Sequence, residues 1–232
     1  AIHLPVALWF VVGYTYLGGN IRSSVKRMDF LRFSGEWLIY YSLIALGGGV
    51  LMSLTMLVLI PFGGEAGQVV STWVLPSGAA AAVIVAAWLV EAKKSVIENL
   101  APVLTAIFTP LFAVMLVVAA VAYVVAGVWR EFDRELLTGF DILLLVVVAL
   151  VVYGISARDS NRGRGVMDII RMLTVAAAIL LDVLVLLSMF SRVGEYGFTA
   201  NRVAALGLNL ILLVNLAIPL WFLARLLAGK AP

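Results

Sequence analysis

Long apolar runs separated by short polar stretches make up most of the chain. A helix needs about 20 apolar residues to cross a bilayer, and seven runs are candidates. A transmembrane barrel would instead alternate polar and apolar residues over segments of about 10 residues. The pattern therefore predicts an all-α, polytopic transmembrane bundle of about seven spans. The predicted spans are residues 2–18, 37–62, 70–90, 102–129, 140–157, 166–190 and 204–228.

The composition favours the same class. Hydrophobic residues make up 64% of the 232 residues and charged residues 12%, which is about half of the ~25% usual in soluble domains. A soluble domain of this size would expose large apolar patches. We expect one transmembrane domain over residues 1–232. Because Ala1 is not an initiator Met, the chain is expected to be processed or to be part of a longer protein.

The residue types present exclude several kinds of site. The chain has no cysteine and one histidine, which excludes disulfides, thiolate nucleophiles, Cys-based metal sites and bis-His haem. A retinal Schiff base needs a lysine inside a span, and the lysines all lie in loops or the tail. We therefore expect no cofactor, no metal and no catalytic residue, and a membrane enzyme is the least favoured class. The lysines are Lys26, Lys93, Lys94 and Lys230.

The basic residues predict the orientation. Of the 16 Lys and Arg residues, four lie on one side of the predicted spans and twelve on the other, and cytoplasmic loops carry the excess. The N-terminus is therefore expected outside and the C-terminus in the cytoplasm. These loops also explain the net charge of +3, so no nucleic-acid partner is expected. The expected partner is the lipid bilayer, with other membrane subunits or a second copy as protein partners. The four residues on the outer side are Arg130, Arg134, Arg192 and Arg202.

One acidic residue lies in the middle of a predicted span. Asp182 interrupts the apolar run AAAILLDVLVLL, Ala176–Leu187. A charged Asp near the bilayer centre costs roughly 2.5–3.5 kcal/mol, and such residues face a bundle interior or a water-filled cavity. Three roles are open for Asp182: a polar clamp that bonds a neighbouring helix, an ion or proton relay, and a substrate contact.

Other polar residues complete a candidate intramembrane site around Asp182. Asp168 and Arg171 precede it on nearly the same helix face, and their three-residue spacing allows an ion pair. Asn209 and Asn215 lie in the last span, which an antiparallel arrangement would bring near. We expect Asp182 to face the interior and to bond one of these two Asn side chains.

The loop before the last span, GEYGFTANR, is a second candidate site. Thr199 suits the N-cap of the last helix, and Gly197 suits a turn that other residues avoid. Tyr196 is typical of the aromatic belt at a membrane interface. Glu195 and Arg202 are expected to pair with each other or to bind a lipid headgroup. A turn and cap explain most of the loop, and contact with a ligand or partner is the alternative.

The start of the second span is a candidate interface. Glu36 suits the positive end of a helix, and Trp37 and Tyr40 are expected to anchor the span at the membrane surface. The preceding residues 18–36 are expected to form a short amphipathic helix against the lipid headgroups. A docking site for a cytoplasmic partner is the alternative for this segment.

Two stretches resemble a known family. FLRFSGEWLIYYSLIALGGGVL and, later in the chain, RVGEYGFTANRVAALGLNL resemble bacterial multi-pass membrane proteins catalogued as domain of unknown function 4153. The resemblance implies that most of this chain corresponds to the C-terminal half of a longer bacterial protein. It implies no activity, because none is settled for that family.

The function expected from the sequence is a membrane-embedded transporter or transport-associated subunit, with an unassigned substrate. The alternative is a non-catalytic scaffold or assembly subunit of a larger complex. The expected location is the bacterial cytoplasmic membrane. A water-filled cavity that reaches Asp182 would favour transport, and a fully packed bundle would favour the scaffold.

The charge asymmetry predicts that residues 18–36 and Pro232 lie on the cytoplasmic side. Single cysteines introduced into this cysteine-free chain can be treated with an impermeant thiol reagent on intact cells and on opened cells. We expect a cysteine between Arg22 and Arg32 to react only after the cells are opened. Reaction in intact cells would contradict the orientation.

Overall fold

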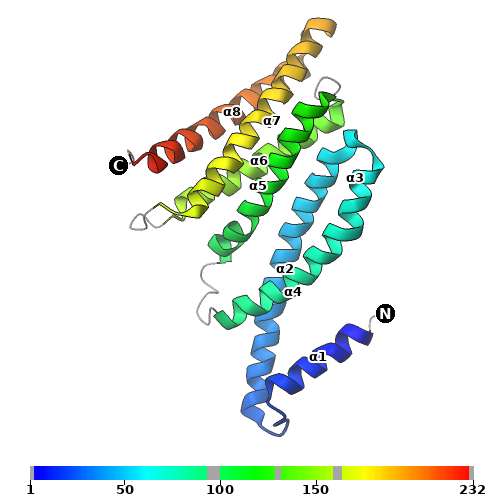
Figure 1. The fold of residues 1–232 in the computed structure, drawn as a ribbon, viewed down its shortest axis with the longest axis vertical. Helices are drawn as coiled ribbons and strands as arrows, with labels where there is room; N and C mark the ends of the chain where they lie inside the picture. The colour runs from blue at the N-terminus through cyan, green and yellow to red at the C-terminus, as the bar shows by residue number, and fades with distance from the viewer. Residues whose placement is uncertain (1–2, 93–99, 129–131, 159–163, 230–232) are drawn as a thin grey trace. The chain divides into compact units, whose positions relative to one another are not determined.

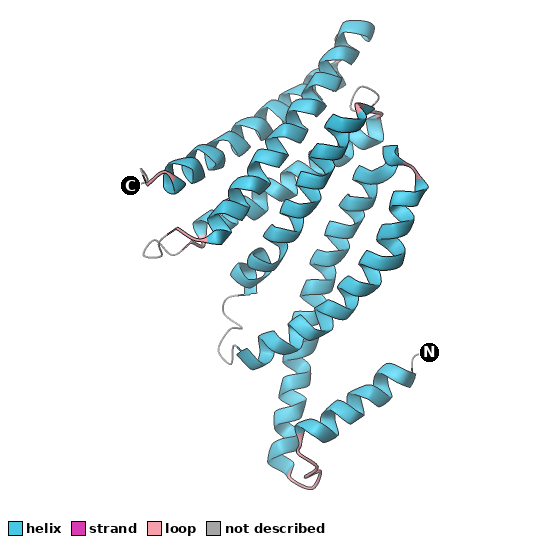
Figure 2. Ribbon diagram, in the orientation of Figure 1, coloured by secondary structure: helices cyan, strands magenta, loops and turns pink. Residues whose placement is uncertain are grey.

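The computed structural model describes residues 3–92, 100–128, 132–158 and 164–229, and every element in these ranges is helical (Figures 1 and 2). The predicted all-α class is confirmed for this part of the chain. The elements are α1 (His3–Tyr16), α2 (Ser24–Leu59), η1 (Ile60–Phe62), α3 (Gly64–Val69), η2 (Val70–Val74), α4 (Leu75–Ala92), α5 (Leu100–Ala126), α6 (Arg134–Ser156), α7 (Val166–Tyr196) and α8 (Ala200–Leu227).

Six segments of the described chain are long and apolar enough to cross a membrane, as expected for an integral membrane protein. α1 is not among them, because its 14 residues reach only about 21 Å at 1.5 Å per residue. The hydrocarbon core is about 30 Å thick. The count of seven spans and the outer position of the N-terminus stay predictions. The six segments are Ser24–Phe62, Gly64–Glu91, Ala101–Ala126, Arg134–Ser156, Val166–Glu195 and Ala200–Leu227.

The predicted boundary between a surface helix and the second span is wrong. α2 begins at Ser24 and continues to Leu59 without a break, because the segment contains no proline and its glycines keep helical backbone angles. The charged residues at the start of α2 and the apolar residues that follow therefore belong to one continuous helix.

The chain forms two compact units. Unit 1 contains Ala1–Leu46 and Pro76–Val96, and unit 2 contains Gly47–Leu75 and Ile97–Pro232. In unit 1, α1 packs against the first part of α2 through aromatic rings. The Trp9 ring centroid lies 4.6 Å from that of Trp37 and 5.8 Å from that of Phe30. The Trp37 indole also donates to Val83 O of α4 at 3.2 Å, which connects α2 and α4.

α7 is the central helix of unit 2. It packs against α5, α6 and α8, which lie beside it in Figure 1. In the apolar window of Val166–Glu195, 61% of residues are buried, more than in any other candidate span. Val175, Ala178, Leu181 and Val185 have no exposed surface. Their spacing of three and four residues defines the buried face of α7.

Glycines and one tyrosine let α2 approach its neighbours in unit 2. A side chain at Gly139 of α6 would clash with Leu57, and one at Gly47 would clash with Phe108 of α5. Close helix approach of this kind is typical of membrane bundles. Tyr123 of α5 is fully buried and donates to Val58 O at 2.7 Å, which satisfies a carbonyl group near the end of α2.

Candidate functional site

Asp182 lies inside unit 2 with no exposed surface. The predicted interior position is therefore confirmed. Neither of its carboxylate oxygens has a hydrogen-bond partner within the described residues. The predicted bond to an Asn of the last span is wrong: Asn215 is exposed and donates to Ile211 O of its own helix at 2.8 Å, and Asn209 bonds another residue.

The partner of Asn209 is Asp141 of α6. Asn209 is fully buried in α8, and its Nδ2 donates to Asp141 Oδ1 at 2.8 Å and to Ala205 O at 3.1 Å. The Sδ atom of Met189 in α7 lies 3.8 Å from the same nitrogen. Three helices therefore meet around one amide group. The bond between Asn209 and Asp141 is the interhelical polar clamp that was expected at Asp182.

Asp141 was not among the residues predicted for the site. The predicted span began at residue 140, which placed Asp141 at the membrane surface. α6 begins at Arg134, so Asp141 lies two turns inside the helix. The signal for the earlier start was Asp133, whose side chain accepts the backbone N–H of Leu136 at 2.7 Å as an N-cap.

Asp141 lies close enough to Asp182 for the two carboxyl groups to interact electrostatically. Charges that are shielded from water interact more strongly than charges at a surface, because the surrounding dielectric constant is lower. Two further buried oxygens of unit 2 have no partner within the described residues: Oδ1 of the Asn209 amide that bonds Asp141, and Ser188 Oγ, which lies six residues after Asp182 on α7.

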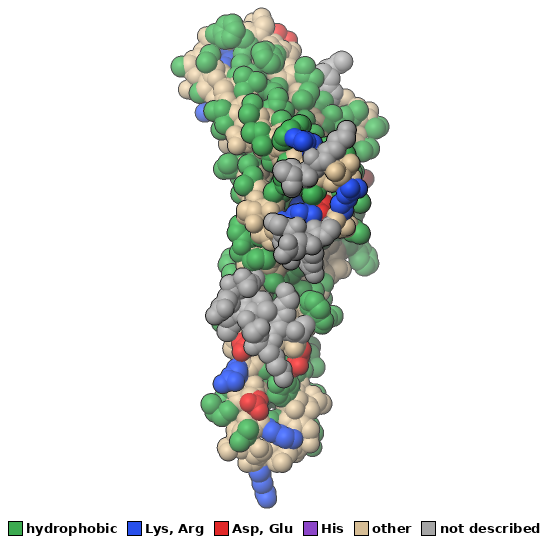
Figure 3. Space-filling model, turned by 90° about the vertical axis from the view of Figure 1, so that its left-hand side faces the viewer, with side chains coloured by type: hydrophobic (Ala, Val, Ile, Leu, Met, Phe, Trp, Pro, Cys, Tyr) green, Lys and Arg blue, Asp and Glu red, His purple; other side chains and the backbone are tan. Residues whose placement is uncertain are grey.

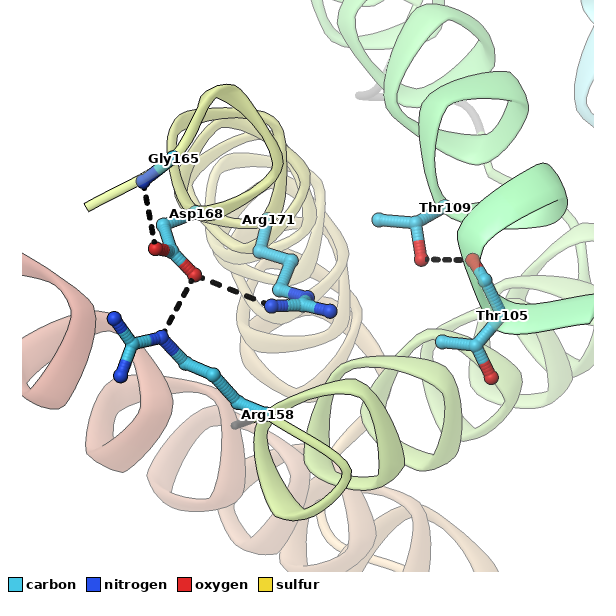
Figure 4. Close-up of polar contacts among 6 residues, drawn as sticks. All are labelled: Thr105, Thr109, Arg158, Gly165, Asp168 and Arg171. Carbon is cyan, nitrogen blue, oxygen red and sulfur yellow. Dashed lines mark hydrogen bonds and ion pairs between the residues drawn. The ribbon is translucent and has the colours of Figure 1, made fainter. Parts of the chain in front are cut away.

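A separate charged cluster lies at the start of α7 (Figure 4). Asp168 is 4% exposed and contacts Arg171 Nη1 at 3.2 Å and Arg158 Nε at 3.3 Å. Its second oxygen accepts the backbone N–H of Gly165 at 3.2 Å. The predicted ion pair with Arg171 is confirmed, and Arg158 adds a second cation from the residues that follow α6. Arg158 therefore joins the residues after α6 to the start of α7, and the other two donors hold the Asp168 side chain within the first turns of α7.

Arg171 is enclosed by small side chains. A Cβ atom at Gly154 of α6 would lie 3.0 Å from Arg171 Nε and 3.2 Å from the methyl carbon of Thr105 in α5. The guanidinium therefore occupies space that only a glycine leaves open. Asp182 follows Arg171 by eleven residues, about 16 Å along the axis of α7. The predicted polar stripe consists of two separate sites.

The loop before α8 has the predicted turn and cap. Thr199 Oγ1 accepts the backbone N–H of Arg202 at 3.4 Å, and Gly197 has a φ of 74°. The Arg202 guanidinium donates to Gly197 O at 2.8 Å. Glu195 is exposed, and its pairing with Arg202 stays a prediction. The side chain of Tyr196 lies outside the described residues.

The candidate interface residues have different surroundings. Trp37 is bonded to α4, as described above, and Glu36 is half-buried. Tyr40 is only 4% exposed, so the predicted role of a lipid-facing anchor is wrong for this side chain. Tyr40 lies one turn after Glu36 and Trp37 on the face of α2 that is covered within unit 1.

Comparisons of the chain with protein-family models, with curated proteins and with solved structures found no match. The resemblance to the bacterial membrane family therefore stays a prediction. The function must be inferred from the polar groups inside the bundle.

The two buried polar residues should respond differently to replacement by leucine. Asn209→Leu leaves Asp141 without its donor and should cost about 1–3 kcal/mol of stability. Asp182→Leu removes a group without a partner and should be neutral or stabilising, because an apolar side chain of similar volume suits its surroundings. Thermal unfolding of the purified variants in detergent micelles measures both effects. A large loss for Asp182→Leu and none for Asn209→Leu would identify Asp182 as the clamp.

Proposed function

We propose that the chain is a membrane-embedded transporter or transport-associated subunit, in which Asp182 binds a proton or a small cation. The observation that supports this is the fully buried carboxyl group of Asp182, which has no hydrogen-bond partner within the described residues. Ionisable residues inside membrane bundles are costly and typically belong to ion pathways and proton relays.

A purely structural role explains Asp182 poorly. A polar clamp stabilises a bundle through a hydrogen bond to another helix, and Asn209 and Asp141 form such a bond. Asp182 adds the cost of burying a carboxyl group without a bond in return. A group of this kind is useful where it must exchange a ligand, because a carboxyl oxygen that is free of protein donors can accept a proton or coordinate a cation.

One further carboxyl group interacts with Asp182. Asp141 of α6 acts on it electrostatically and supplies a second carboxylate to the same region. A bound proton or cation removes the repulsion between the two carboxylates. Exchange with either side then requires a second conformation in which water reaches Asp182, as alternating access implies.

The burial of Asp182 also supports the alternative function, a non-catalytic scaffold or assembly subunit. Its carboxylate oxygens are out of contact with water in this conformation, so a bundle that never opens would keep Asp182 inactive. The protein partners would then be other membrane subunits or a second copy of the chain.

The proposed location is the bacterial cytoplasmic membrane, with the basic loops in the cytoplasm. This assignment does not depend on α1. The basic residues Arg22 to Arg32 lie at the start of the first of the six longer segments, Lys93 and Lys94 lie between the second and the third in sequence, and Arg158 to Arg171 lie between the fourth and the first turns of the fifth. If all six segments cross the membrane, the three groups fall on the same side. If α1 does not cross the membrane, only the position of the N-terminus changes.

A proton-binding experiment separates the two functions. The folded wild type and Asp182→Asn can be compared by infrared difference spectroscopy during pH titration in micelles. Asparagine keeps the size of the side chain and removes its ionisation. For a transporter, we expect a carboxyl band that titrates reversibly in the wild type and is missing in Asp182→Asn, with similar thermal stability of the two proteins. Glu65→Gln, which changes an exposed acid at the start of α3, is the control and should keep the band. Identical titrations of wild type and Asp182→Asn would favour the scaffold.

A further inference from the structure

Unit 1 contains a pocket that the proposed function does not use. It has a volume of about 660 Å³ and is formed by the end of α1, the first part of α2 and the end of α4. Figure 3 shows acidic and basic side chains close together at the end of unit 1 where α1 turns into α2. The lining residues are Tyr16, Lys26, Asp29, Arg32, Phe33, Glu36, Val90 and Glu91.

The charged side chains of the pocket have both signs and are not paired with one another. Two are basic and three are acidic, and no ion pair joins any two of these five described residues. Lys26 Nζ donates to Leu17 O at 3.0 Å, which leaves further protons for a ligand. The three carboxylates all act electrostatically on the hydroxyl group of Tyr16. The three acidic groups and Tyr16 therefore line the same pocket within electrostatic range of one another.

The pocket lies where the apolar parts of its helices end. The apolar segment that includes α4 ends at Glu91, and the apolar part of α2 follows the charged residues and begins at Trp37. Tyr16 and Trp37 add the aromatic side chains that are typical of a membrane–water interface. A bilayer therefore places this pocket at the level of the lipid headgroups. Buried Phe33 and Val90 give it an apolar wall.

We propose that this pocket binds the headgroup of a zwitterionic lipid that carries a primary ammonium and a phosphate, as in phosphatidylethanolamine. Lys26 and Arg32 contact the phosphate, and Asp29, Glu36 and Glu91 accept hydrogen bonds from the ammonium group. The apolar wall contacts the glycerol and the first part of the acyl chains.

The charges disfavour the other common headgroups. An anionic headgroup without an amine leaves three carboxylates without a partner and is repelled by them. A choline headgroup has a positive charge but no N–H, so it cannot donate hydrogen bonds to the carboxylates. A primary ammonium both carries the positive charge that the three carboxylates need and donates hydrogen bonds to them.

The experiment measures which lipid the 232-residue chain retains. Purified protein in micelles is mixed with equal amounts of phosphatidylethanolamine, phosphatidylcholine and phosphatidylglycerol, and the bound lipids are identified by native mass spectrometry. We expect phosphatidylethanolamine to be retained preferentially. Arg32→Gln and Glu91→Gln should each weaken its binding roughly tenfold, because each removes a charge-assisted hydrogen bond. Arg22→Gln and Glu65→Gln, at exposed positions outside the pocket, are matched controls and should retain it.

Two results would overturn the proposal. One is equal or stronger retention of phosphatidylglycerol, which would indicate general attraction of anionic lipids to basic residues. The other is unchanged retention in both pocket variants, with folding verified by thermal unfolding. If Glu91→Gln does not fold, Asp29→Asn replaces it and should show the same loss.

Competition with soluble phosphoethanolamine tests whether the pocket binds a lipid or a soluble molecule that has the same headgroup. Phosphoethanolamine lacks the glycerol and acyl groups that contact Phe33 and Val90, so we expect it to displace little of the bound lipid at equal concentration. Complete displacement would assign the pocket to a soluble zwitterion and contradict the lipid assignment.

Discussion

A lipid bilayer offers no hydrogen-bond partners, so every polar group on a membrane helix must find one inside the protein or remain without. α7 has four buried polar side chains: Asp168, Thr174, Asp182 and Ser188. Asp168 has three donors, and Thr174 donates to Ile170 O at 2.8 Å. Asp182 and Ser188 have none within the described residues. The start of α7 is therefore a structural anchor, and its middle contains polar groups that have no hydrogen-bond partner within the described residues.

The packing of unit 2 maintains this difference between the start and the middle of α7. α7 is enclosed by α5, α6 and α8, and its buried face is made of small and branched residues such as Ala178 and Val185. Asp182 and Asn209 have no exposed surface, and Asp141 is partly buried beside them. Asn209 supplies a donor to Asp141 and not to Asp182. One carboxyl group is thus held by a protein donor, and the other is the one that we propose binds a proton or cation.

The features that depend on local sequence could be predicted, and those that depend on helix rotation could not. The cost of exposing a carboxylate to lipid placed Asp182 inside, the three-residue spacing gave the pair of Asp168 and Arg171, and Thr199 was recognised as a cap. The bond between Asn209 and Asp141 depends on how α6 and α8 turn towards each other, which no short stretch of sequence specifies. The pocket beside Glu36 likewise needs the end of α4 to lie against α1 and the start of α2, which are distant from it in the chain. The charged residues of the pocket could be read from the sequence, but it could not be predicted that they lie close together in the folded chain.

The central claim is that Asp182 is reached by water in a second conformation. Ala178 lies one turn before Asp182 and has no exposed surface, so a cysteine there reports on the same interior. In the reconstituted, otherwise cysteine-free protein, we predict that a small water-soluble thiol reagent modifies Ala178→Cys slowly. A cysteine at Leu180, which is 42% exposed and is expected to face lipid, should stay unmodified. Failure to modify Ala178→Cys under conditions in which a loop cysteine reacts completely would contradict the account.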